Sequence, residues 1–321
     1  MARAVQPFLA DILAHHGRYF GRACDMARAL DMNSRTDAAE LTRQERAIAA
    51  KYQGGFPWLM AFWGVGNSCV WLALWPLTLM GLIPLWLTFI VATANVMLSY
   101  LPSHDAQHDI FVARGSKRHW INELIGHVSI FPLVLAFRTA RETHLGHHRH
   151  ANDPALDPDY PSHAPNAWAA LWKTIENRQP GSAGKARYGA YLTAKGTPAA
   201  KIALRDGLLM QTFFYTVLAA MAWAGYAIEV AVLWWLPRHI AQTYISFFLS
   251  WAPHHPAQEQ GRYRETRAFK SRLGNLGSMG MQYHIVHHLY PTIPLTKTPA
   301  AYRALRPILE ARGCELGGLD R

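Results

Sequence analysis

The chain has 321 residues, of which 50% are hydrophobic and only 17% are charged, a balance that indicates a membrane protein. The net charge of +11 is not accompanied by a nucleic-acid-binding motif, so we expect no nucleic acid partner and infer that anionic lipid headgroups supply the counter-charge. The three scattered cysteines argue against a disulfide framework and a Cys-x-x-Cys metal site.

Residues 1–51 mix arginines with acidic residues and interrupt every apolar run, so they do not have the pattern of a signal peptide. Four apolar residues near their start recur at helical spacing: Phe8, Leu9, Ile12 and Leu13. An amphipathic helix on the membrane surface and a plain soluble helix fit this pattern equally well. We therefore expect an N-terminal cytoplasmic or interfacial segment at 1–51 and a single membrane domain at 52–321.

Two pairs of apolar segments follow, and each pair is long enough for two membrane-spanning helices. No charged residue occurs from Tyr52 to Ser103, and about 20 residues suffice for one span. The four predicted spans lie near residues 57–77, 80–101, 208–227 and 230–251. The sequence thus predicts an all-α integral membrane fold with four transmembrane helices.

The fourth predicted span contains Arg238 and His239, which are unfavourable in a lipid environment. A charge inside the bilayer costs several kcal/mol unless it faces a cavity or a partner. A helix broken at Pro237, or a span that starts later, would also fit the sequence.

Three clusters of histidines lie outside these spans or at their ends. The first has the spacing His-x-x-x-His and the other two the spacing His-x-x-His-His. Positions i, i+3 and i+4 share one face of an α-helix, so we expect each cluster to project its imidazoles into one place. The eight histidines are His104 and His108, then His144, His147 and His148, then His284, His287 and His288.

Neutral imidazole is a common ligand for transition metals, and this clustering predicts a metal site. Eight ligands are too many for a structural zinc ion, which takes four and usually includes cysteine, so two metal ions are predicted. The chain has no Glu-x-x-His pair of the kind found in soluble di-iron bundles. A pair of irons held mainly by histidine is the best fit.

The segments between the apolar pairs carry further expectations. Residues 119–137 are moderately apolar but contain charged and titratable side chains, which favours a pair of interfacial helices over a span. The proline-rich stretch 152–161 carries carboxylates that could orient the histidines by hydrogen bonding or could cap turns, and the sequence favours neither. Residues 173–206 are expected to form a polar connection.

Four spans return the chain to its starting side of the membrane. The N-terminal segment, the long loop at 104–206 and residues 252–321 then share one side, and they hold nearly all the lysines and arginines. By the positive-inside rule this side is cytoplasmic, so both termini and every histidine cluster are expected there, in a helical cap on a bacterial inner membrane.

The clusters, their order and their distance from the apolar pairs resemble the membrane fatty-acid desaturase and hydroxylase superfamily. Within it, three stretches are most similar to β-carotene hydroxylases of the cyanobacterial and plant-like type. They are His144–Asp159 (HLGHHRHANDPALDPD), Pro253–Arg267 (PHHPAQEQGRYRETR) and Gln282–Pro294 (QYHIVHHLYPTIP). The resemblance implies a ninth histidine ligand after the fourth span, for which His254 is preferred and His255 is the alternative. His150 and His163 are not required by the family pattern, and we expect them to support the site or to lie on the surface.

The same resemblance implies two irons, O₂ as co-substrate and electrons from reduced ferredoxin or a similar external donor, which a basic cytoplasmic face would suit. It implies hydroxylation of a lipid dissolved in the membrane, with the β-ring of a carotenoid as the expected substrate. The alternative is an acyl-lipid desaturase or hydroxylase, which would share the site. A metal transporter is a third hypothesis, but the spans offer too few ionisable residues for it.

Overall fold

A computed structural model describes residues 37–179 and 181–319 of the chain. The described residues are helical or irregular and contain no strand, which confirms the all-α prediction for them. The chain divides into two compact units, Met1–Lys51 and Tyr52–Arg321, and the described part of the first unit is a helix at 37–50. The helical pattern predicted at Phe8 to Leu13 lies outside the described residues.

The first apolar pair forms helices α2 (Trp58–Leu79) and α3 (Leu85–Leu98), and α3 is followed directly by α4 (Tyr100–Gln107). The turn between α2 and α3 contains Gly81, whose φ of +69° is a conformation that glycine adopts without strain. Among the described residues, two stretches are long and apolar enough to cross a membrane by themselves, α2 and the run Leu85–Gln107.

The second apolar pair forms α9 (Pro198–Trp223) and a long helix that begins with α10 (Ala227–Val230) and α11 (Leu236–Ile245). Two π-helical stretches, Ala231–Trp235 and Ser246–Trp251, precede and follow α11, so the helix is not broken at Pro237. α9 starts ten residues before the predicted span because the Thr197 side chain caps it and Pro198 suits the first helical position. Neither helix is apolar enough to be counted as a span by composition alone.

The segment predicted as a polar connection is instead largely helical. It contains the last four residues of α7 (Ala167–Glu176) and all of α8 (Ala183–Lys195), and α9 begins within it. The Asn166 side chain caps the N-terminus of α7 by accepting a hydrogen bond from the backbone N–H of Ala169. α8 packs against α6 and α9, so its order depends on tertiary contacts.

The range 119–137, where a pair of interfacial helices was expected, contains one α-helix, α5 (Trp120–Ile130), and a 3₁₀ turn at Phe131–Leu133. The next helix, α6 (Phe137–His150), begins only at the end of this range. Together the two helices are long and apolar enough to cross a membrane, but the chain bends by 97° between them. They therefore form either a broken span or a re-entrant segment. Counting them gives three candidate spans in the described part of the chain.

The bend leaves three consecutive backbone carbonyls without helical partners, and side chains from the second apolar pair bind all three. Trp234 Nε1 donates to the Pro132 carbonyl at 2.7 Å. Gln242 donates to Leu133 at 3.4 Å, and Gln211 of α9 donates to Val134 at 3.2 Å. Because an unpaired backbone group in an apolar environment is costly, these side chains make the bend tolerable at its depth in the protein.

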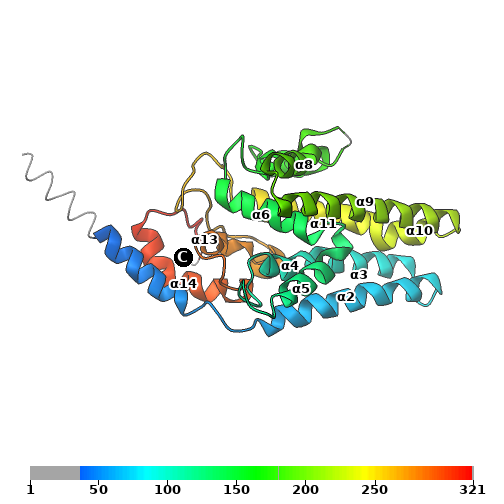
Figure 1. Cartoon of the computed structure of the whole chain (residues 1–321), viewed down its shortest axis with the longest axis horizontal. Coiled ribbons are helices and arrows are strands. Elements are labelled where there is room, and N and C mark those ends of the chain that lie inside the picture. Colours follow the sequence, from blue (N-terminus) through cyan, green and yellow to red (C-terminus); the bar gives the residue numbers. More distant parts are fainter. Residues whose placement is uncertain (1–36, 180, 320–321) are drawn as a thin grey trace, which may run out of the picture. The chain divides into compact units, whose positions relative to one another are not determined.

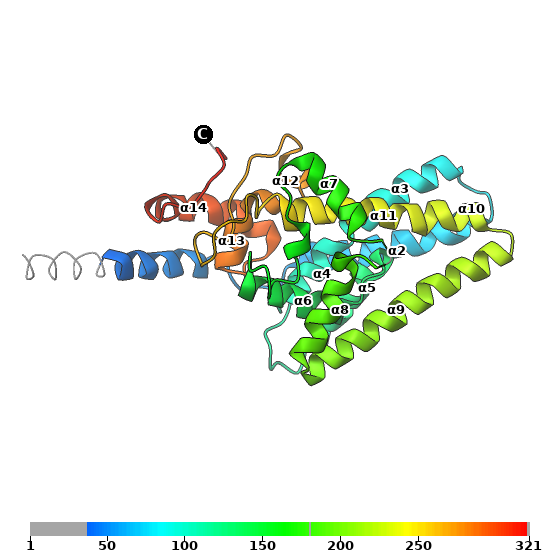
Figure 2. The same ribbon diagram turned by 90° about the horizontal axis from the view of Figure 1, so that it is seen from above.

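The C-terminal part of the chain returns to the histidine-bearing end of the helices. It comprises α12 (Gly274–Gly277), α13 (His284–Leu289) and α14 (Thr298–Ala311), with 3₁₀ turns at Met281–Tyr283 and Leu295–Lys297. Within the second unit, the α2–α3 turn and the α9–α10 turn lie at one end and α13 lies at the other (Figures 1 and 2).

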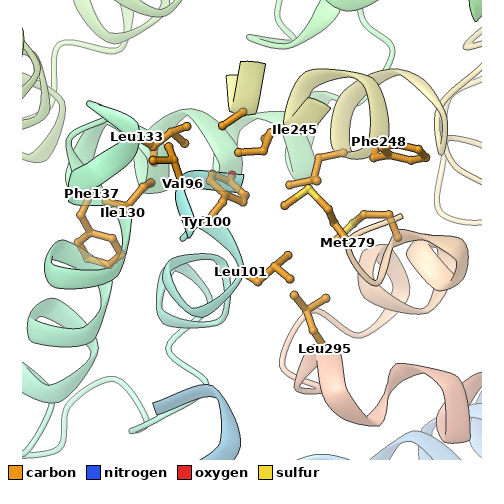
Figure 3. Close-up of a cluster of buried hydrophobic side chains, with 14 of the residues drawn as sticks. Val96, Tyr100, Leu101, Ile130, Leu133, Phe137, Ile245, Phe248, Met279 and Leu295 are labelled. Carbon is orange, nitrogen blue, oxygen red and sulfur yellow. The ribbon is translucent and has the colours of Figure 1, made fainter. Parts of the chain in front are cut away.

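A buried apolar cluster joins these elements (Figure 3). One of its members, Tyr100, lies against His104 with the ring centroids 5.9 Å apart. Its members come from α3 and α4, from the α5–α6 bend, from the long α11 helix and from the C-terminal segment. Examples from these four sources are Val96, Leu133, Ile245 and Leu295, each no more than 9% exposed. The cluster therefore fixes the relative positions of the three histidine-bearing segments.

We predict that Trp234→Phe destabilises the protein by about 1–3 kcal/mol, because the Pro132 carbonyl loses its partner while remaining buried. Thermal unfolding of the purified protein in detergent measures the loss. Trp223→Phe is the matched control, since that tryptophan is 94% exposed. Equal effects of the two substitutions would contradict the role assigned to the hydrogen bond.

Candidate metal centre

The histidines of the three clusters converge from α4, α6 and α13, together with one histidine that follows the long α11 helix. Their ring nitrogens form two sets of four, and within each set the ligand atoms all lie within 4.8 Å of one another. The first set comprises His104, His108, His144 and His287, and the second comprises His147, His254, His284 and His288. All eight residues are buried.

Each His-x-x-His-His cluster is divided between the two sets, which differs from the expectation that a cluster points into one place. Successive residues of an α-helix are rotated by about 100°, so positions i and i+4 differ by only about 40°, whereas i+3 lies about 60° to the other side of i. In α13, His284 and His288 accordingly enter the second set and His287 enters the first. In α6 the arrangement is reversed, with His144 in the first set and His147 in the second.

His148 belongs to neither set of four but lies against both. Its Nε2 is 2.9 Å from Nε2 of His287 and 3.2 Å from Nε2 of His144, so its nitrogen approaches the first set. Its ring stacks on that of His288 with the ring centroids 4.1 Å apart. The nine histidines that the sequence and the resemblance singled out thus lie in one continuous cluster.

Several of these histidines use Nδ1 to hold the ring in place, which leaves Nε2 to bind a metal. Nδ1 of His147 is 2.9 Å from Asp157 Oδ1, and Nδ1 of His254 is 2.9 Å from the Glu265 carbonyl. Nδ1 of His288 is 3.1 Å from the Glu265 carboxylate. Glu265 was not singled out from the sequence, although it lies in the stretch Pro253–Arg267 that carried the resemblance.

The chemistry of the cluster fits metal ligation. Nε2 of His284 and of His288 are buried and have no hydrogen-bond partner among the described residues. Burial is the main reason that the pKa of both side chains lies well below the usual value, and repulsion from neighbouring imidazoles adds to it. Burial also lowers the pKa of His254 to about 3. Neutral imidazoles with free Nε2 lone pairs are the form that binds a transition metal.

The carboxylates of the proline-rich stretch 152–161 have separate roles. One orients a histidine and another caps a turn, so both roles that the sequence left open occur. Asp157 holds His147 and also accepts from the Asn152 backbone. Asp153 caps a turn by accepting from the backbone of Ala155 and Leu156. Asp159 accepts from the Tyr188 hydroxyl at 2.6 Å.

An ion-pair network positions α6 relative to the first cluster. The guanidinium of Arg141 donates to both carboxylate oxygens of Asp109, at 2.7 and 2.8 Å, directly after His108. Arg138 bridges Glu123 of α5 and Asp206 of α9. Charge-assisted hydrogen bonds in a partly buried setting are among the stronger ionic contacts, so the Arg141–Asp109 pair holds α6 in register with the end of α4.

Three other histidines near the clusters lie outside both sets of four. The ring of His255 packs on Trp251 at 4.8 Å, and that of His163 packs on Tyr160 at 4.2 Å. His150 is half-buried at the end of α6. The placement of His254 in the second set favours it over His255 as the ninth ligand.

A cavity of about 590 Å³ reaches the histidines from between α6, α7, α8, α9 and the long α11 helix. Its lining includes His104 and His144 of the first set and His147 and His284 of the second. The volume lies within the range of about 300–1,000 Å³ that is typical of ligand pockets. A molecule in this cavity would therefore contact both sets of histidines at once.

The model of the family described as "Fatty acid desaturase" matches residues 80–317, which includes every histidine of the cluster. The chain belongs to the fatty acid desaturase family. With the buried histidine sets, this membership identifies an oxidoreductase, indicates iron as the metal and, with the apolar helices, indicates a membrane protein. The resemblance stated from the sequence is thereby confirmed at the level of the superfamily.

Relatives in this family include both acyl-lipid and carotenoid enzymes. The "sn-1 oleoyl-lipid 12-desaturase" of Picosynechococcus sp. is 32% identical over 99 residues, 31% of this chain and 24% of the relative. The "Beta-carotene ketolase" of Paracoccus sp. is 26% identical over 209 residues, 63% of this chain and 72% of the relative. The "sn-1 acyl-lipid omega-3 desaturase (ferredoxin)" of Nostoc sp. is 23% identical over 242 residues, 65% of this chain and 64% of the relative. The chain thus spans about a quarter of the length of the oleoyl-lipid desaturase.

We predict that Asp157→Asn weakens iron binding by about 10–100-fold, because His147 loses the carboxylate that fixes its ring and raises its basicity. Iron titration of the purified protein measures the change, and the unsubstituted protein should hold about two irons, one for each set of histidines. Asp153→Asn is the control, since that carboxylate contacts only backbone amides of a turn. One zinc and no iron in the purified protein would contradict the assignment.

Proposed function

We propose that this protein uses two irons and O₂ to oxidise a C–H bond of a membrane-dissolved lipid that occupies the 590 Å³ cavity. The observation that carries the proposal is that the cavity lining includes histidines of both sets. Side chains alone cannot attack an unactivated C–H bond, and bound iron would supply the required oxidising power. The chain's own contribution is to hold the metals, to position the lipid and to limit the access of water.

In this proposal the first iron is held by the first set of four histidines with His148 beside it, and the second iron by the second set. Asp157 and the Glu265 backbone carbonyl fix the rings of His147 and His254. Ligand rings that are oriented in advance keep both metals next to the lipid, which is the positioning that a regioselective oxidation needs.

For the substrate we propose the β-ring of a carotenoid, which the enzyme hydroxylates. The similarity of Pro253–Arg267 to carotenoid hydroxylases supports this choice, and Glu265 of that stretch contacts His288. The alignment with a relative named for β-carotene also covers 63% of the chain. The second candidate is oxidation of an acyl lipid, favoured by the relatives that are named as acyl-lipid desaturases.

The proposed membrane arrangement is the four-span topology, with the histidine cluster and both termini in the cytoplasm of a bacterium. The electron donor would be a ferredoxin-like protein, as in the name of the Nostoc relative. The net charge of +11 would assist the approach of an acidic carrier.

Expression in a β-carotene-producing bacterium tests the reaction. We expect a new, more polar pigment, identified by chromatography and mass spectrometry as a ring-hydroxylated carotenoid. His287→Ala should abolish it, because that side chain contributes to the first set of histidines. The control His150→Ala should retain it, since His150 lies outside both sets. No new pigment together with a new double bond in the membrane fatty acids would contradict the carotenoid proposal and support the acyl-lipid alternative.

A reporter fused to the C-terminus tests the topology. An even number of spans and the concentration of lysine and arginine on one side predict cytoplasmic activity of the reporter. A second fusion in the α2–α3 turn, at Gly81, should report the opposite side of the membrane. A C-terminal reporter that is active only in the periplasm would contradict the proposed orientation.

A further inference from the structure

The cavity contains a polar end that the metal site does not explain. One face of the long α11 helix and the π-helical stretch that follows it lines the cavity along its length. The residues of this face include Arg238, Gln242, Ile245, Ser246, Leu249 and Ser250. Twelve residues separate Arg238 from Ser250, which corresponds to about 18 Å along a helix.

The Ser250 end of this face is near the histidines. The hydroxyl of Ser250 is 3.3 Å from Asp159 Oδ2, and Asp159 follows closely on Asp157, which holds His147. The Arg238 end therefore lies away from the position where the lipid would be oxidised. A polar group of the lipid that binds at Arg238 would therefore be a group that the lipid carries before the reaction, and not the group that oxidation introduces at the histidines.

Arg238 is a buried cation without an acidic partner in the described part of the chain. Its side chain is 8% exposed, and its Nε has no hydrogen-bond partner among the described residues. Its guanidinium lies over the ring of Phe214 at 5.0 Å, and the like charge of Arg178 repels it. A buried guanidinium in this situation gains free energy from an oxygen acceptor placed in the cavity.

Gln242 lies one helical turn after Arg238, on the same face. Its Nε2 donates to the Leu133 carbonyl, while its Oε1 is buried and has no partner among the described residues. Both residues thus line the cavity, four positions apart, and each has a buried polar atom without a hydrogen-bond partner among the described residues, a donor in Arg238 and an acceptor in Gln242.

We propose that this end of the cavity binds a hydroxyl group carried by the lipid substrate. Arg238 donates to the hydroxyl oxygen, and Gln242 Oε1 accepts the hydroxyl hydrogen. A hydroxyl group satisfies both side chains, because it is a donor and an acceptor at once. The inference rests on the proposed function, because it assumes that the lipid substrate occupies this cavity.

Other lipid groups fit this pair less well. A bare hydrocarbon such as β-carotene would displace water from the cavity and leave both polar side chains unpaired, which costs affinity. A carboxylate would pair with Arg238 but would face the Gln242 oxygen with a second acceptor. The preferred substrate is therefore a lipid that already bears a hydroxyl group at the end remote from the histidines.

Binding to the purified, iron-loaded full-length protein in detergent tests the inference without turnover. The probes are β-carotene, its derivative with one ring hydroxyl group, the methyl ether of that derivative, and a long-chain fatty acid. We expect the hydroxylated derivative to bind about tenfold to a hundredfold more tightly than β-carotene. The methyl ether should be intermediate, because it accepts from Arg238 but cannot donate to Gln242.

Substitutions give the second arm of the test. Arg238→Met should remove the preference for the hydroxylated probe, whereas Arg272→Met, at an exposed arginine, should retain it. The comparison of hydroxyl with methyl ether uses the unsubstituted protein and holds even if Arg238→Met does not fold.

Equal affinities of the unsubstituted protein for β-carotene, the hydroxylated derivative and the ether would overturn the inference. Tightest binding of the fatty acid, lost in Arg238→Met, would also overturn it and assign a carboxylate site instead. Absence of lipid oxidation in the bacterial host contradicts the proposed function, whereas these binding results concern the hydroxyl site alone, so the two failures are distinguishable.

Discussion

The structure depends on bringing nine imidazoles into one largely buried volume. Ring nitrogens of different histidines lie about 3 Å apart, so several positive charges could not share this volume, and metal ions would supply the positive charge. At His147 the Asp157 carboxylate outweighs burial and raises the pKa to about 9. Helical geometry then divides the imidazoles. In α13 the i and i+4 histidines belong to the second set and the i+3 histidine to the first, whereas in α6 the i histidine belongs to the first set and the i+3 histidine to the second. Two short helices can thereby surround two metal positions.

This convergence requires a backbone path that a simple helical bundle does not provide. The bend between α5 and α6 turns α6 so that its histidines meet those of α4 and α13, at the cost of three carbonyls without helical partners. Trp234, Gln242 and Gln211 satisfy them from neighbouring helices. Gly146, between the histidines of the second cluster, lets Tyr191 of α8 pack against α6, where a Cβ atom would overlap the tyrosine ring. The polar side chains of the apolar helices thus support the metal centre indirectly.

The two ends of the cavity differ in their chemistry. Its inner end is formed by histidines that the family match covers, and relatives in this family include both acyl-lipid desaturases and a β-carotene ketolase. Its outer wall contains Arg238 and Gln242, which belong to the long α11 helix and take no part in metal binding. If the proposed hydroxyl site is correct, substrate choice in this protein depends on residues remote from the chemistry, where binding interactions set position.

The sequence by itself determined the helical class, the apolar pairs and the eight clustered histidines, because hydrophobic composition and residue spacing are local properties. The ninth histidine, His254, followed only from the family resemblance, which left His255 as an alternative. It also indicated two possible roles for the carboxylates near the second cluster, to orient histidines or to cap turns, without assigning either role to a particular residue. It did not determine how each cluster is divided between two sets, that Glu265 holds His288, that 173–206 is mostly helical, or that α5 and α6 form a bent pair. Nor did it show what Arg238 faces. Those features depend on contacts between segments that are separated in the sequence, by 23 residues for Glu265 with His288 and by more than a hundred for His147 with His254 and Trp234 with Pro132, and only tertiary packing brings such segments together.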